Sequence, residues 1–303
     1  MTRIASIVRL AAAISLTSAG FAIADKASAD CASYEQAVQD ALARNDHGAL
    51  KSAYDNVTAC DDAVFRAGLG RAIAGKLFNR LTAERKTSDN LNEILSYGRV
   101  WQAEATLGDL SYRAHNYAKA AAQLQDALTT INDKSVTANP PPQDTIGAIF
   151  HQAEEANLLA SENVPVPRGR GGENEGLGAF TIRGFKPSGV SMPVQFVFGK
   201  ADFTPQGQIA AQSLVDFIQH AETPPARVKL VGHTDHVGSE EANLVLSRLR
   251  AKAVADFLVA HGVKNIPIDT EGVGKSKPYE SADRTSLSQD QQDQLDRRVE
   301  LVH

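Results

Sequence analysis

The sequence Gly232-His233-Thr234-Asp235 stands just ahead of a long segment, residues 240–261, whose apolar residues recur with helical spacing. On a helix, Asn243, Ser247 and Arg250 project from the middle of that apolar face, at relative positions i, i+4 and i+7. An arginine at the centre of an apolar face costs free energy unless another group pairs with it. We therefore expect the first turns of this helix to face a polar pocket, in which Asp235 is the partner of Arg250.

Segments on both sides of this stretch alternate between short apolar runs and amphipathic helices. The apolar runs predict strands, and the helix that starts near Pro205 places this residue where its missing backbone donor costs least. The predicted order is β-α-β-α-β-β, a mixed sheet with helices on one face. The strands are expected at residues 194–198, 228–231, 266–271 and 297–302, the helices at 205–221 and 240–261, and a polar surface excursion at 281–294.

Together these motifs resemble the OmpA-like C-terminal domain, a module that holds bacterial envelope proteins to peptidoglycan. The resemblance covers residues 185–303, and one residue departs from it, because Asp296 stands where the family usually has Asn before an arginine pair. Besides the helix, it rests on Pro193-Val194-Gln195-Phe196-Val197-Phe198, Phe203-Thr204-Pro205-Gln206-Gly207, Gly272-Val273-Gly274 and Arg297-Arg298-Val299-Glu300-Leu301.

The resemblance implies a binding role for Asp235 and Arg250. In the family, the matching pair grips the zwitterionic end of diaminopimelate in the peptidoglycan stem peptide. This chemistry suits the side chains, since a guanidinium binds a carboxylate through two parallel hydrogen bonds and an aspartate accepts them from an ammonium group. An internal salt bridge between Asp235 and Arg250 is the alternative, and the two interpretations are compatible.

Further candidate contacts lie beside this pair. Asn243, Ser247 and Thr234 are placed to hydrogen-bond the stem peptide. The alternative for Asn243 and Ser247 is that they cap backbone groups or hold Arg250 in place. Arg298, on the last expected strand, either approaches the pocket or is an exposed strand charge.

Residues 30–161 are rich in alanine and helical in period, which predicts an all-α domain of helical hairpins. One segment, residues 106–117, resembles a tetratricopeptide unit, in which the small residue Gly108 lets two helices approach. Stacked hairpins need several units to bury a continuous core, so about three are expected. The chain is thus predicted to be an α+β protein of two domains, joined by a Pro/Gly-rich linker at 162–184 that lets them move independently.

The N-terminus has the composition of an export signal. An apolar, uncharged run extends over residues 10–24, and small residues offer cleavage after Ala24 or Ala29, so residues 1–29 are assigned to a signal peptide. The run is shorter than a membrane-spanning helix requires. Retention of this segment as a membrane anchor is the alternative, whereas Asp30 directly before Cys31 argues against a lipoprotein.

The chain has only two cysteines, Cys31 and Cys60. They flank a predicted hairpin of two helices, residues 33–43 and 48–58, whose antiparallel packing would bring them together. Because an exported chain meets an oxidising compartment, we expect a disulfide bond between them. Two free buried thiols are the alternative.

Other function classes find little support in the sequence. With a net charge of −5 and no basic run with interleaved aromatic residues, no nucleic-acid partner is expected. His233 and His236 flank Asp235, but this part of the chain offers no second ligand cluster, so neither a metal nor a cofactor is expected. Nucleophile elbows, Walker loops and dinucleotide fingerprints are missing, and we expect no enzyme.

The sequence therefore predicts an exported protein of the periplasm or cell envelope, with association to the outer membrane left open. Its C-terminal domain is expected to bind peptidoglycan non-covalently, and its helical domain to bind an unknown envelope protein. A membrane contact is expected only if the N-terminal segment is retained. The alternatives are a cell-wall enzyme that the C-terminal domain targets, and a membrane-anchored envelope spacer.

Overall fold

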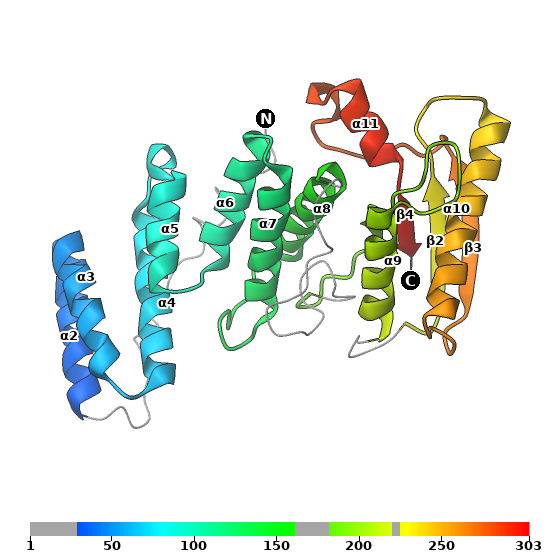
Figure 1. Ribbon diagram of the computed structural model, residues 1–303. Coiled ribbons are helices and arrows are strands. Elements are labelled where there is room, and N and C mark those ends of the chain that lie inside the picture. The colour runs from blue at the N-terminus through cyan, green and yellow to red at the C-terminus, as the bar shows by residue number, and fades with distance from the viewer. Residues whose placement is uncertain (1–28, 161–181, 220–224, 303) are drawn as a thin grey trace.

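The computed structural model describes residues 29–160, 182–219 and 225–302, so the expected signal peptide, apart from Ala29, and most of the expected linker lie outside the described residues. The N-terminal part of the chain is a row of helices, and the C-terminal part, where described, is a β-sheet with three further α-helices (Figure 1). This arrangement confirms the α+β fold class. The first group consists of α2 (Ala29–Arg44), α3 (His47–Asn56), α4 (Ala63–Arg80), α5 (Ser88–Tyr97), α6 (Trp101–Arg113), α7 (Tyr117–Asn132) and α8 (Gln143–Leu159).

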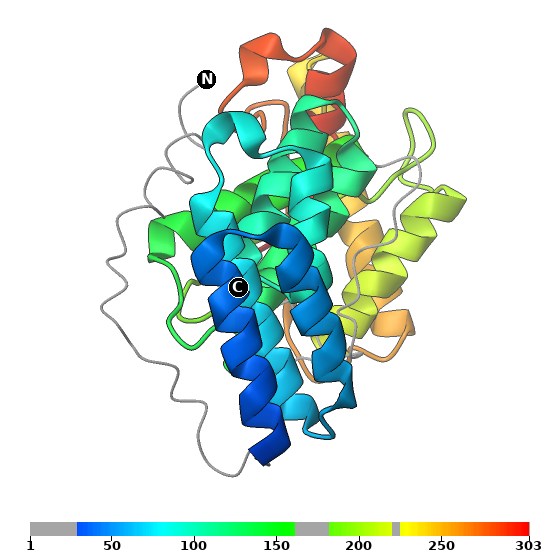
Figure 2. The ribbon, with the colours of Figure 1, turned by 90° about the vertical axis from the view of Figure 1, so that its left-hand side faces the viewer.

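Short polar side chains begin several of these helices. Asp46, Asp62 and Asn116 each accept a hydrogen bond from the backbone N–H three residues later, which satisfies a donor that the helix leaves unpaired. Successive helices pack as hairpins, and the view along the row shows α2 and α3 at the end away from the sheet (Figure 2). On α6, a Cβ added to Gly108 would lie 2.5 Å from Cγ of Leu124, so a small residue is needed there, as expected. Whether these hairpins belong to the tetratricopeptide type stays a prediction.

Cys31 and Cys60 form a disulfide bond, which confirms the predicted pairing. It ties the start of α2 to the residue that follows the short 3₁₀ turn after α3, and both half-cystines are buried. The two cysteines enclose a long loop, separated by 29 positions in the chain. In the chain-entropy account, closing a loop of that size stabilises the fold by about 3–4 kcal/mol.

The C-terminal part is a four-stranded mixed sheet in the order β1-β4-β2-β3. β4 pairs antiparallel with both β1 and β2, and β2 pairs parallel with β3 across a connection that contains α10. The elements are β1 (Gly189–Met192), α9 (Pro205–Gln219), β2 (Val228–His233), α10 (Glu240–Ala260), β3 (Ile268–Gly274), α11 (Gln289–Asp296) and β4 (Val299–Val302).

Two local predictions differ from the observed structure of the C-terminal part. The first strand was expected at 194–198, but β1 ends at Met192. The segment after it closes on itself instead, because Val197 N donates to Asp202 O and Thr204 N donates to Gln195 O. The expected surface excursion at 281–294 contains most of α11, which Ser288 begins with a reciprocal capping box.

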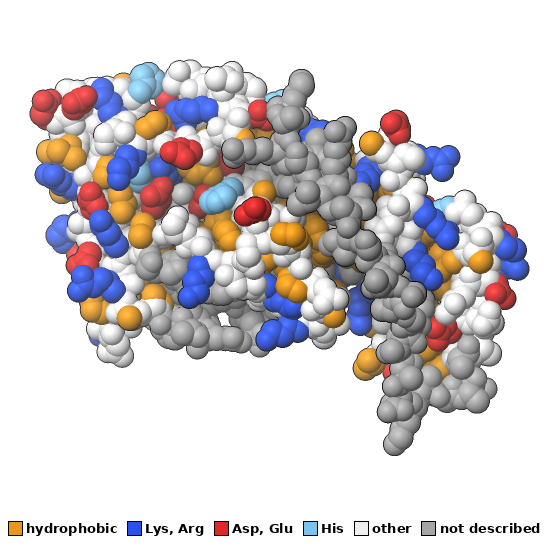
Figure 3. All heavy atoms as spheres, turned by 180° about the vertical axis from the view of Figure 1, so that it is seen from behind, with side chains coloured by type: hydrophobic (Ala, Val, Ile, Leu, Met, Phe, Trp, Pro, Cys, Tyr) orange, Lys and Arg blue, Asp and Glu red, His pale blue; other side chains and the backbone are white. Residues whose placement is uncertain are grey.

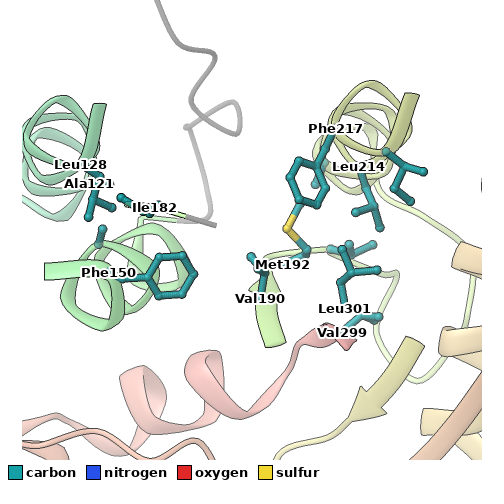
Figure 4. Packing of buried hydrophobic residues seen from close by; sticks show 14 of the residues in the cluster. Ala121, Leu128, Phe150, Ile182, Val190, Met192, Leu214, Phe217, Val299 and Leu301 are labelled. Carbon is teal, nitrogen blue, oxygen red and sulfur yellow. The ribbon is translucent and has the colours of Figure 1, made fainter. Parts of the chain in front are cut away.

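Helix α8 joins the two parts into one core. Phe150 on α8 and Val190 and Met192 on β1 belong to the same buried cluster as the inner residues of α9 and α10 (Figure 4). Ile182 and Phe185, near the expected end of the linker, pair through two backbone hydrogen bonds and pack against this cluster. The structure therefore differs from the expectation of two independently moving domains.

The surface is mixed in charge. On the face seen from behind, basic and acidic side chains are interspersed over the described residues (Figure 3). None of the helices in the described ranges is long and apolar enough to cross a membrane.

Candidate functional site

Gly232 and His233 are the last residues of β2, Thr234 and Asp235 follow directly, and α10 packs against this strand. Gly232 and Gly272 allow this close contact, because an added Cβ would lie 2.2 Å from Ser247 O at the first position and 2.3 Å from Arg248 N at the second. Ser239 then caps α10 by accepting a hydrogen bond from Ala242 N. The polar face of α10 is thereby pressed against the ends of β2 and β3.

Arg250 is buried on this face, with only 7 % of its surface exposed. Its Nε donates to the carbonyl oxygen of Lys200 at 3.1 Å, and its guanidinium lies over the Phe196 ring, 5.1 Å from the centroid. Burial lowers the pKa of the Arg250 guanidinium, while the charge of Asp235 raises it and the charge of Arg297 lowers it. Since arginine stays protonated in proteins, the site holds a permanent and largely desolvated positive charge.

The expected direct ion pair between Asp235 and Arg250 is not formed. Oδ2 of Asp235 instead accepts a hydrogen bond from Nη1 of Arg297 at 2.9 Å, and its Oδ1 accepts one from Val237 N at 3.1 Å. Arg297 directly follows α11, two residues before β4 begins, and it is the ionic partner of Asp235 that Arg250 was expected to be. Arg297 is the first residue of the pair Arg297-Arg298 noted in the sequence. Its contact with Asp235 could not be predicted without knowing the order of strands in the sheet.

Arg298 is not the exposed strand charge of the alternative interpretation. It is 5 % exposed, its Nε and Nη2 donate to Glu300 at 3.0 and 2.8 Å, and it lies over the Tyr279 ring. Burial would raise the pKa of Glu300, but the hydrogen bond from His233 and the charge of Arg298 lower it to about 2. Arg298 is therefore held beside the site by a carboxylate that stays ionised.

Two of the three lesser candidates, Asn243 and Ser247, have structural partners for their side chains. Nδ2 of Asn243 donates to Val237 O at 2.8 Å, and the hydroxyl of Ser247 donates to Leu244 O and accepts from Gly274 N. These contacts fit the alternative in which both side chains hold the local backbone. The Thr234 hydroxyl is buried without a hydrogen-bond partner among the described residues, and Thr234 is not part of the cavity lining described below.

Arg250, Arg297 and Arg298 line a cavity of about 240 Å³, whereas Asp235, Thr234, Asn243 and Ser247 are not part of its lining. The lining combines these arginines with apolar residues. Two of its residues, Leu158 and Gln294, lie outside the sequence prediction and come from α8 and α11. The lining consists of Leu158, Pro193, Val194, Gln195, Phe196, His233, Arg250, Gln294, Arg297 and Arg298.

The histidines of this region contact protein groups. Nδ1 of His233 lies 3.1 Å from Lys277 O, and its Nε2 lies 3.3 Å from a carboxylate oxygen of Glu300. Nδ1 of His236 lies 2.7 Å from Asp293. Among the described residues, no three His, Cys, Asp or Glu side chains converge where a metal ion could bind.

Comparison with known proteins identifies this part of the chain. Residues 195–301 match the OmpA family. Outer membrane protein P5 of Haemophilus influenzae is 36% identical over 97 residues, which are 32% of this chain and 27% of that protein. Outer membrane protein A of Klebsiella aerogenes is 38% identical over 85 residues, 28% of this chain and 24% of that protein. The match thus spans about a quarter of the length of these relatives.

Two solved structures are also similar to this chain. The OmpA-like domain of FopA1 from Francisella tularensis is 25% identical and covers 37% of this chain and 69% of its own, with a TM-score of 0.30. The peptidoglycan-associated lipoprotein from Burkholderia pseudomallei is 29% identical and covers 36% of this chain and 86% of its own, with a TM-score of 0.29.

Proposed function

We propose that this chain, whose residues 195–301 form an OmpA-family domain, is an exported cell-envelope protein that binds peptidoglycan non-covalently. The ligand group is the zwitterionic end of diaminopimelate in the stem peptide. One observation carries the proposal: Arg250 is buried at a cavity, and no carboxylate among the described residues forms an ion pair with it. A buried charge without an ionic partner costs free energy. In this proposal, the carboxylate of the ligand is the ionic partner of Arg250.

The two charges of the ligand are matched by Arg250, which lines the cavity, and by Asp235, which is bonded to the lining residue Arg297. The carboxylate binds the guanidinium of Arg250, and Arg298 also belongs to the lining. The ammonium group binds Asp235 and displaces Arg297, whose side chain is 45% exposed and free to turn toward solvent. The pair is only partly exposed, but its ionic contact is replaced by one of the same kind when a ligand ammonium group takes the place of Arg297, so the exchange costs little.

The helical domain has the second role in this proposal, as a module that binds another envelope protein. Its outer helices support this role, because α2 to α5 and part of α6 form a hydrophobic core of their own that contains no residue of the sheet. Residues such as Val64, which is 78 % exposed on α4, remain available on that part of the surface.

Co-sedimentation with purified peptidoglycan sacculi tests the binding site. Arg250→Ala and Asp235→Ala should each lower the bound fraction to a level that reflects at least a tenfold loss of affinity, since removing one partner of a desolvated charged contact costs about 2–5 kcal/mol. Arg248→Ala is the matched control, because it removes the same charge from an exposed position on the same helix. Wild-type sedimentation of folded Arg250→Ala would refute the proposed site.

A further inference from the structure

Phe198 is an aromatic side chain that the fold leaves in water. It is 92% exposed, although removing apolar area from water is favourable. A single exposed apolar residue is common on a protein surface and needs no explanation by itself. What sets Phe198 apart is its place in the chain, because it lies between two residues that both contact Arg250.

The backbone fixes Phe198 at the tip of a tight turn. Lys200 N donates to Val197 O at 3.0 Å, which closes a four-residue turn with Phe198 and Gly199 at its centre. Gly199 has a φ of +68°, a left-handed conformation that a type II turn requires at its third position and that glycine adopts without strain. A second hydrogen bond, from Val197 N to Asp202 O at 2.8 Å, holds the turn. The fold therefore presents the ring of Phe198 from a fixed backbone position.

Both arms of this turn contact Arg250, the proposed carboxylate receptor. The ring of Phe196 lies 5.1 Å from the guanidinium and lines the cavity, and Lys200 O accepts a hydrogen bond from Nε at 3.1 Å. Phe196 is also bridged to Phe203 and stacked on its ring, which closes the base of the turn. Since an extended chain advances about 3.3–3.6 Å per residue, Cα of Phe198 lies within about 7 Å of the Cα atoms of both Phe196 and Lys200. Phe198 is therefore at the rim of the site and open to solvent.

We infer that Phe198 binds the glycan part of peptidoglycan, by stacking its ring on the face of a sugar next to the bound stem peptide. This inference rests on the proposed function, which brings to Arg250 a stem peptide together with the sugar strand that carries it. A pyranose has polar edges and small apolar faces of C–H groups, and a flat aromatic ring covers such a face without needing a polar partner. The neighbours Gly199 and Lys200 add no apolar area, so the turn fits a small apolar face better than a lipid surface or a broad protein interface.

Two probes separate the sugar contact from the peptide contact. They are the free tripeptide L-Ala-D-Glu-meso-diaminopimelate and the same tripeptide attached to the disaccharide N-acetylglucosaminyl-N-acetylmuramic acid, each titrated by calorimetry into the full-length protein. The wild type should bind the disaccharide-tripeptide about three- to tenfold more tightly, since part of one ring face and one sugar face leave water. In Phe198→Ala this gain should disappear, while the affinity for the free tripeptide stays at the wild-type level.

Three further variants define what the contact requires. Phe198→Trp retains a flat ring and should retain the gain. Phe198→Leu retains an apolar side chain without a flat face and should lose most of the gain. Val64→Ala removes an exposed apolar side chain from α4 in the helical domain, and as the control it should behave as the wild type does. Circular dichroism checks that all variants are folded.

Three results would overturn the inference. Equal affinities of the wild type for the two probes would show that the sugar adds no contact. A sugar gain that persists in folded Phe198→Ala would place the contact elsewhere on the protein. Equal weakening of both probes in Phe198→Ala would show that the ring contacts the peptide or only supports the turn at Arg250. Titration of Arg250→Ala with the free tripeptide separates the two claims, because unchanged binding by that variant refutes the proposed function itself.

Discussion

Nη1 of Arg297 donates to Oδ2 of Asp235 at 2.9 Å, so the carboxylate that the ligand ammonium group requires is already occupied by an arginine of the chain. Arg297 is 45% exposed at its side chain, whereas Asp235 is 14% exposed. The pair holds the Asp235 carboxylate in place, and the exposure of Arg297 leaves the pair open to exchange. In the proposed function, binding at this site is therefore an exchange of partners at Asp235.

Replacing Asp235 should separate binding from stability. In Asp235→Asn, the oxygen that accepts from Val237 N is retained, and only a partly exposed ion pair is lost. We expect the free energy of unfolding to change by less than about 1 kcal/mol, while sacculus binding falls at least about tenfold. Urea unfolding and co-sedimentation measure the two quantities. A large loss of stability would mean that the Asp235–Arg297 pair serves the fold.

Removing the disulfide should affect only the helical domain. The double variant Cys31→Ser, Cys60→Ser loses the cross-link between α2 and the residue after α3, which should lower the free energy of unfolding of that domain by about 3–4 kcal/mol. Sacculus binding should stay at the wild-type level, because the core around the disulfide contains no residue of the sheet. Unfolding curves with and without reductant provide the check, and a wild-type curve in the variant would contradict it.

Stability in acid should depend on Glu300. Its pKa in the folded protein is lowered to about 2 from a reference value of 4.5, so its stabilising contribution is present above pH 4.5 and is lost as the pH falls toward 2. In Glu300→Gln this pH-dependent contribution is absent at every pH, because glutamine does not titrate. Chemical unfolding at pH 7, 4 and 3 should show a smaller acid-induced decrease in the variant than in the wild type. Equal decreases would assign the acid sensitivity to other groups.

Gly232 should tolerate no side chain. The Cβ of Gly232→Ala would lie 2.2 Å from Ser247 O, a backbone atom of α10 that can shift only with the helix. We expect a loss of about 1–3 kcal/mol in the free energy of unfolding, together with weaker sacculus binding. Gly75→Ala on α4 is the control: its Cβ would meet nothing within 4 Å, so it should be neutral or stabilising. Similar losses in both variants would contradict this account.

The sequence predicted the parts of the site that a single helix carries. Asn243, Ser247 and Arg250 share one face of α10 as their spacing indicates, and Asn243 and Ser247 are buried against loop and strand backbone. The disulfide was also predictable, because a helical hairpin brings its own two ends together. Such predictions need only local geometry.

Contacts between distant segments were not predictable in this way. Arg297 reaches Asp235 only because β4 lies beside β2 in the sheet, an order that the strand pattern does not specify. Leu158 reaches the cavity because α8 packs against β1 and α11, across a segment that its composition marks as a linker. Apolar and acidic residues on one helix indicate burial, but they do not indicate which partner buries them.

The most direct test of the central claim compares two tripeptides that differ in one carboxylate. Titration calorimetry with the full-length protein should detect binding of L-Ala-D-Glu-meso-diaminopimelate. The lysine-ended peptide L-Ala-D-Glu-L-Lys lacks the carboxylate assigned to Arg250, and should bind at least about tenfold more weakly. Equal affinities for the two peptides would contradict the assignment of Arg250 as the carboxylate receptor of the site.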